Sequence, residues 1–105
     1  MENKSIGNAI ALRRGRWSSY NQIYLITSCT SNRLQIFGNF YYARKLVSIL
    51  KEESTRGTCT TLAFVIMPDH LHWLLQLETG ELSQIVGRIK SLMAREVGEQ
   101  IWQPG

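Results

Sequence analysis

The hydrophobic residues of the chain follow two spacings, one of two residues and one of three to four, and these predict the order of its elements. Segment 21–30, "NQIYLITSCT", is rich in Ile, Tyr and Thr and is typical of a strand. After the polar connection "SNRLQIFGN", a helix is predicted from Asn39, a good N-cap, to Gly57. Its apolar face is expected to contain the residues that recur at helical spacing: Phe40, Ala43, Val47 and Leu50.

A β-hairpin is predicted over residues 58–78. The first strand, 58–67, ends in a run too continuously apolar for one of its faces to lie in water. Pro68 and Asp69 supply turn chemistry, and "LHWLLQLE" (71–78) is the returning strand.

The remaining pattern predicts a second helix and the beginning of one more strand. The helix begins at Leu82 and ends at Gly98, and "EQIWQPG" is typical of a strand start. The order is that of an α+β, ferredoxin-like βαββα(β) fold: an antiparallel sheet with both helices on one face and its last strand cut short. We expect a basic arm at 1–19 and a single domain at 20–105.

Composition narrows the class of protein without naming a function. The chain has 105 residues, of which 44% are hydrophobic and 19% charged, as in ordinary globular domains. A net charge of +4 suits a phosphate-bearing partner. No apolar run is long enough to cross a bilayer, and Cys29 and Cys59 lack the spacing of a disulfide or metal framework. We therefore expect a cytoplasmic protein with reduced thiols.

The N-terminal segment "LRRGRWSS" places Arg13, Arg14 and Arg16 around a glycine. It fits a solvated terminus. It also fits a basic arm along a nucleic-acid backbone, with Trp17 as an anchor or a stacking surface.

His70 and His72, the only histidines, lie two residues apart on a predicted strand, so both imidazoles should face the same side. Two imidazoles are half of a metal site, and the alternative is a pair of structural histidines bonded to backbone carbonyls. For the two histidines alone, structural packing is the more common arrangement. The position beside a tight turn on an apolar hairpin strengthens the case for a metal site, since burying two unpaired polar rings would be costly, and both interpretations stay open at this point.

The string "FVIMPDHLHWLLQL" strongly resembles the HUH single-strand DNA endonucleases, and within them the REP-associated single-tyrosine transposases. The resemblance extends to "RGRW", to "LSQIVGRIKSLMAREVG" and to "IWQPG". It implies that His70 and His72 hold a divalent cation, Mg²⁺ or Mn²⁺, at the scissile phosphate of single-stranded DNA. It also implies DNA contacts for Arg13, Arg14, Arg16 and Lys90, although Lys90 on residue type alone could be a solvated helix charge.

In that family a tyrosine attacks the phosphate, leaving a 5′-phosphotyrosine link and a free 3′-OH. The resemblance places this tyrosine and a further metal ligand beyond Gly105, and none of Tyr20, Tyr24, Tyr41 and Tyr42 matches the nucleophile. We therefore expect no catalytic tyrosine in this chain and no nicking by the chain alone.

Three hypotheses remain open on the sequence. The chain is part of a transposase that nicks and joins single-stranded or hairpin DNA, or a catalytically inactive module that only binds DNA hairpins. In the third hypothesis, the chain is a ferredoxin-like interaction module with structural histidines. A homodimer and a monomer are both compatible with the sequence.

Overall fold

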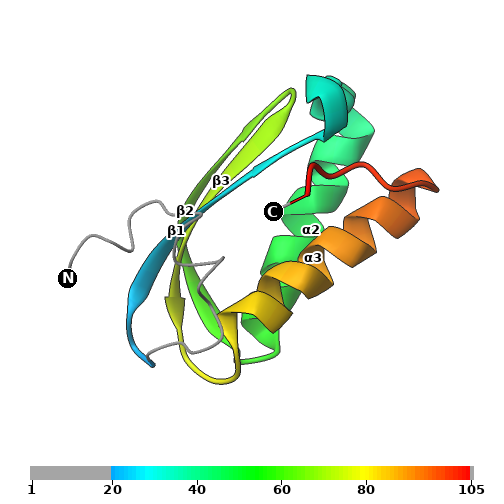
Figure 1. The fold of residues 1–105 in the computed structure, drawn as a ribbon. Coiled ribbons are helices and arrows are strands. Elements are labelled where there is room, and N and C mark those ends of the chain that lie inside the picture. Colours follow the sequence, from blue (N-terminus) through cyan, green and yellow to red (C-terminus); the bar gives the residue numbers. More distant parts are fainter. Residues whose placement is uncertain (1–19, 105) are drawn as a thin grey trace.

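The computed structural model describes residues 20–104, which form one antiparallel sheet with a layer of helices on one side (Figure 1). The elements in chain order are β1 (Ile23–Cys29), two 3₁₀ turns (Ser31–Arg33 and Ile36–Gly38), α2 (Phe40–Thr55), β2 (Cys59–Met67), β3 (His70–Leu77) and α3 (Leu82–Val97). The α+β class and the element order agree with the prediction, and each predicted boundary is met within about two residues.

The helix ends follow from local chemistry. The Asn39 side chain caps α2 by accepting a hydrogen bond from the Tyr41 backbone N–H at 2.8 Å. Gly57 and Gly98, which follow the two helices, have φ angles of 86° and 99°, a left-handed conformation in which glycine avoids the steric cost of a Cβ. The predicted ends at these residues are confirmed.

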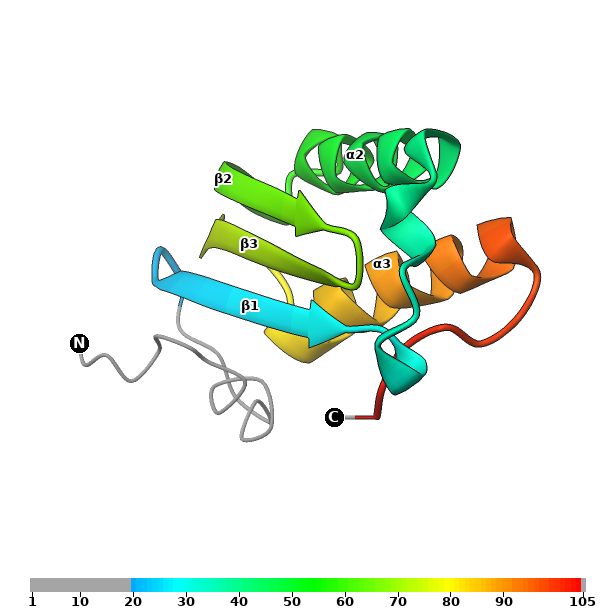
Figure 2. The same ribbon diagram turned by 90° about the horizontal axis from the view of Figure 1, so that it is seen from above.

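The strands are ordered β1-β3-β2, so β3 is central and β2 lies at an edge (Figure 2). Alternate residues of β3 face the helices and are fully buried, and the residues between them face the opposite side of the sheet. We call that opposite side the open face, because in the described part of the chain no helix covers it (Figure 1). The core between sheet and helices includes Ile26, Leu46, Leu50, Leu71, Trp73, Leu75, Leu77, Ile85, Ile89 and Met93.

Two predictions about burial are wrong. β2 is not covered on both faces: Leu62, Phe64, Val65 and Met67 are 40–53% exposed, because an edge strand has a neighbour on one side only. The predicted apolar face of α2 is correct at Leu50, which is 1% exposed, and wrong at Phe40, which is 73% exposed. Packing also buries Leu46 and Glu53, which the prediction did not include.

The segment after α3 begins to extend the sheet beyond β1. Trp102 forms an isolated antiparallel bridge with Thr30, and the Gln103 N–H donates to the Cys29 carbonyl at 2.9 Å. Ile101 and Trp102 are buried, at 2% and 5% exposure. The predicted strand start therefore pairs with the free edge of β1.

Candidate metal and DNA site

His70 and His72 lie side by side on the open face of β3. Their ring centroids are 4.8 Å apart and the rings are nearly perpendicular, at 84°. This follows from the two-residue period of a strand, which places i and i+2 on one side. Each histidine has a neighbour on both adjacent strands, Cys29 and Met67 for His70, and Thr27 and Val65 for His72.

His70 is held by the residue before it. Its Nδ1 lies 2.7 Å from Oδ1 of Asp69. An ionised carboxylate only accepts hydrogen bonds, so Nδ1 carries the hydrogen and Nε2 keeps its lone pair in the neutral ring. The hydrogen bonds from His70 and Arg33 hold the pKa of Asp69 below its usual value.

His72 has its own partner on β1. Its Nδ1 lies 3.1 Å from the hydroxyl oxygen of Thr27, which can accept or donate. In both histidines Nδ1 is thus engaged by a neighbouring side chain, and Nε2 is the nitrogen left to bind a ligand. A shallow hollow of about 200 Å³ adjoins His72 and is otherwise apolar, lined by Leu25, Ala63, Phe64, Val65 and Leu74.

This donor set fits a metal ion in part. Imidazole nitrogen with a second partner on Nδ1 is a common ligand arrangement for Mn²⁺, Fe²⁺ and Zn²⁺, whereas Mg²⁺ prefers oxygen. Among residues 20–104, no group of three or more His, Cys, Asp and Glu is close enough to surround an ion. Within residues 20–104 the two histidines alone therefore do not complete the coordination of a metal ion.

Of the predicted DNA-contacting residues, only Lys90 falls within the described part of the chain; Arg13, Arg14 and Arg16 lie outside it. The Lys90 amine is 5.8 Å from the centre of the Trp102 ring, and burial lowers its pKa from the ordinary value of a lysine. The side chain borders a hollow of about 470 Å³ that also contains Gln100, Gln103 and Ser91. Lys90 is thus half-buried against an aromatic ring and is not a fully solvated helix charge.

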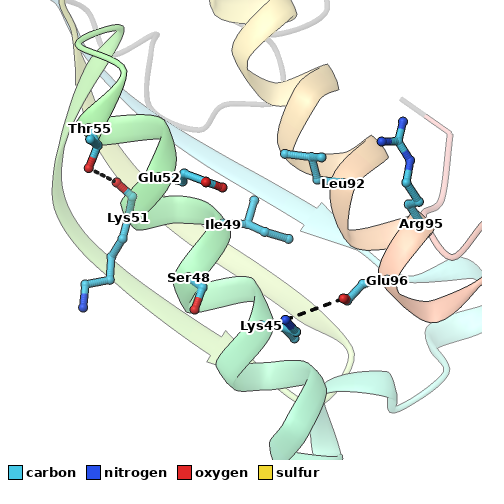
Figure 3. Close-up of a pocket in the computed structure, with 9 residues that line it drawn as sticks. All are labelled: Lys45, Ser48, Ile49, Lys51, Glu52, Thr55, Leu92, Arg95 and Glu96. Carbon is cyan, nitrogen blue, oxygen red and sulfur yellow. Dashed lines mark hydrogen bonds and ion pairs between the residues drawn. The ribbon is translucent and has the colours of Figure 1, made fainter.

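Another hollow, of about 590 Å³, lies between α2 and α3, in the helix layer and away from the histidines (Figure 3). The residues that line it carry both charges, namely Lys45, Lys51 and Arg95 with Glu52 and Glu96, and Lys45 pairs with Glu96 at 3.6 Å. Opposite charges in one shallow groove largely cancel, so this surface does not select for an anion such as DNA.

Comparison with known proteins identifies the family. Residues 18–103 match the family model of IS200-like transposases. The chain belongs to the IS200-like transposase family. A search among curated proteins finds no significant match.

Two solved structures resemble this transposase chain. One is a REP-associated tyrosine transposase bound to a REP hairpin, with a TM-score of 0.66 and 21% identity over 86% of this chain. The match covers 56% of that protein, so the chain spans little more than half its length. The other is a candidate transposase from Deinococcus radiodurans R1, with a TM-score of 0.69 and 25% identity over 87% of this chain and 79% of that one.

Sequence reasoning found the histidine pair but missed the residues that hold it. The sequence pattern marks Asp69 as a turn residue, and its position directly before His70 is the one local signal of its second role. Thr27 and Arg33 lie more than thirty residues from the histidines in sequence, and nothing in their local pattern marked them. They reach the site only because β1 pairs with β3 and the following 3₁₀ turn meets the hairpin turn.

Proposed function

We propose that this chain provides the metal-holding part of a transposase that nicks and joins single-stranded DNA next to a DNA hairpin. The observation that supports it is the pair of imidazoles on the open face, each with Nδ1 engaged and Nε2 available. The IS200-like family and the hairpin-bound structural neighbour agree with DNA as the partner.

In this proposal His70 and His72 bind one divalent cation, Mn²⁺ or Mg²⁺, through Nε2. The bound ion would polarise a phosphate oxygen and orient the DNA backbone. Asp69 and Thr27 keep the two rings oriented by hydrogen bonds to Nδ1, and apolar residues line the hollow beside His72.

A second candidate function is binding to DNA hairpins without cleavage. Its support is the position of the four tyrosines. Tyr24 is buried toward the helices, Tyr41 and Tyr42 belong to α2 in the helix layer, and Tyr20 precedes β1 at the end opposite the histidines. Tyr24, Tyr41 and Tyr42 therefore do not share the open face with His70 and His72, and Tyr20 lies at the far end of β1 from them.

Metal titration of the full 105-residue chain tests the first part of the proposal. Electron paramagnetic resonance measures the binding of Mn²⁺. We expect the wild type to bind Mn²⁺, and His70→Ala and His72→Ala each to lower the affinity at least about tenfold. Gln76→Ala is the matched control, because Gln76 lies on the same strand and the same face, farther from the turn. Unchanged Mn²⁺ affinity in both histidine variants would show that they do not hold the metal.

DNA binding and covalent chemistry separate the alternatives. Fluorescence anisotropy with a labelled DNA hairpin carrying a single-stranded flank should give similar affinity for the wild type and the histidine variants. If the histidine variants lose both hairpin binding and thermal stability, the histidines are structural. An SDS-resistant protein–DNA adduct formed by this chain with Mn²⁺ would make one of its four tyrosines the nucleophile and exclude the binding-only function.

A further inference from the structure

The carboxylate of Asp69 joins Arg33 to His70. Oδ1 accepts from His70 Nδ1 at 2.7 Å, and Oδ2 accepts from Arg33 Nε at 2.9 Å. The three residues come from a 3₁₀ turn, the β2–β3 turn and the first position of β3. Both oxygens of one carboxylate are used, so Arg33 and the metal-site histidine are held by the same group.

The backbone that delivers Arg33 is strained. Asn32 and Arg33 have φ angles of 52° and 54°, a left-handed conformation in which the Cβ of an ordinary residue lies too close to the following carbonyl oxygen. Asparagine tolerates it better than arginine does. Thr30 holds the segment to the hairpin turn, since its N–H donates to the Asp69 carbonyl at 3.0 Å. Its hydroxyl lies 2.7 Å from the Leu34 carbonyl and 3.2 Å from the Asp69 carbonyl, so its one hydrogen is shared between them. Strain retained in this way is concentrated at functional sites in proteins.

The guanidinium group of Arg33 is only partly used. Nε is its one hydrogen-bonding nitrogen among the described residues, and the side chain is 56% exposed. Within residues 20–104 the four N–H donors of the two terminal nitrogens therefore have no hydrogen-bond acceptor. Planar paired donors of this kind match the oxygens of a phosphate group better than the point charge of a lysine does.

The other cations near this end of the molecule are less suited. Lys90 is half-buried over the Trp102 ring, and Lys45 is paired with Glu96. Arg44 lies over the exposed Phe40 ring, at 5.6 Å from its centre. Among the cations of residues 20–104, only Arg33 combines exposed donors with a hydrogen bond to the carboxylate that holds His70.

We propose that Arg33 binds a backbone phosphate of the DNA beside the metal site, and that Asp69 is the positioning residue that holds Arg33 and His70 together. This rests on the proposed function, because it assumes that DNA occupies the open face. It assigns the phosphate contact to a residue outside the histidine motif, and it explains why a strained turn is retained there.

Hairpin binding by full-length variants tests the role of Arg33. Arg33→Ala should weaken binding of the labelled hairpin about tenfold and reduce the slope of log affinity against log salt concentration by about one unit. Arg33→Lys should keep most of the salt slope but still lose affinity, because it cannot present paired donors. Arg95→Ala, an exposed arginine of α3, is the control and should change little.

Two substitutions at Asp69 test the connection. Asp69→Asn keeps an oxygen for His70 but loses the charge that holds Arg33, so hairpin binding should fall while Mn²⁺ affinity changes less than about threefold. Asp69→Ala should also lower Mn²⁺ affinity about tenfold or more and remove the preference of His70 for a protonated Nδ1, which ¹⁵N NMR of the ring reports. In the Asp69→Ala protein, adding Arg33→Ala should have little further effect on DNA binding.

Each outcome separates this inference from the broader proposal. If the wild type does not bind the hairpin, the proposed function fails. If the wild type binds and Arg33→Ala behaves like Arg95→Ala, only the inference about Arg33 fails. If Arg33→Ala does not fold, the hairpin affinity of Arg33→Lys tests the inference instead. Wild-type affinity in Arg33→Lys would mean that the Arg33–Asp69 pair only stabilises the turn.

Discussion

Glu53 and Arg88 form a two-point ion pair between α2 and α3. Nε and Nη2 of Arg88 donate to the two carboxylate oxygens at 2.9 and 2.6 Å, and the Glu53 side chain is 1% exposed. The Thr58 hydroxyl adds a third hydrogen bond at 2.6 Å. A glutamate on the buried face of a helix is thus satisfied by the neighbouring helix and by the loop that enters β2.

Removing this carboxylate should destabilise the fold. Glu53→Ala leaves Arg88 and Thr58 without their partner, and we expect a loss of about 2 kcal/mol in the free energy of unfolding. Arg88 is partly exposed and can recover water, which keeps the loss below that of a fully buried pair. Urea denaturation measures this free energy. The control is Glu52→Ala, at the exposed neighbouring position, which should change the free energy of unfolding little. Equal losses in the two variants would contradict a stabilising role of the Glu53–Arg88 pair.

The same carboxylate should make stability depend on pH. Burial by itself would raise the pKa of Glu53, but hydrogen bonds from Arg88 and Thr58 and the charges of Arg88 and Arg56 outweigh burial and leave it below the ordinary value of 4.5. The unfolded chain then binds the proton more readily, so this stabilisation is present above pH 4.5 and is lost as the pH falls through the native pKa.

Glu53→Gln isolates that dependence. The difference in unfolding free energy between wild type and Glu53→Gln should be largest near neutral pH and shrink below pH 4.5. Urea titrations at a series of pH values measure it, and a difference that is constant with pH would show that the Glu53 charge contributes nothing.

Trp102 should control how firmly the last described segment docks. Its indole N–H donates to the Lys90 carbonyl at 3.0 Å and its ring centre lies 5.7 Å from that of Phe37. Trp102→Ala should increase amide hydrogen exchange at Gln103 at least about tenfold, because local opening becomes easier. Glu99 is an exposed residue before the segment, and Glu99→Ala should leave the exchange rate at Gln103 unchanged. A similar rise at Gln103 in the Glu99→Ala protein would show that the effect is not specific to Trp102.

The edge strand β2 should be prone to self-association at high concentration. In residues 20–104 it pairs only with β3, and Leu62, at the register shift of this pairing, is 46% exposed. Leu62→Lys should raise solubility without changing the thermal midpoint, as measured by light scattering and circular dichroism. Leu34 is an apolar loop residue that is 57% exposed, and Leu34→Lys should not raise solubility. Equal gains in both variants would make the added charge the cause.

The sequence by itself determined the local elements and the facing of the histidines. An N-cap at Asn39, glycines at 57 and 98 and a Pro-Asp turn fix where the helices and the hairpin end, because each depends on a few adjacent residues. The strand period then places His70 and His72 on one face. These features need no contact between distant segments.

The tertiary structure decided which neighbours those elements meet. The position of β2 at the edge, the exposure of Phe40 and the buried pair of Glu53 with Arg88 depend on strand order and helix packing. The carboxylate of Asp69 meets Arg33 because the turn after β1 packs against the hairpin turn. Local periodicity carries no information on such contacts, because they join residues that are far apart in the sequence and meet only in the folded chain.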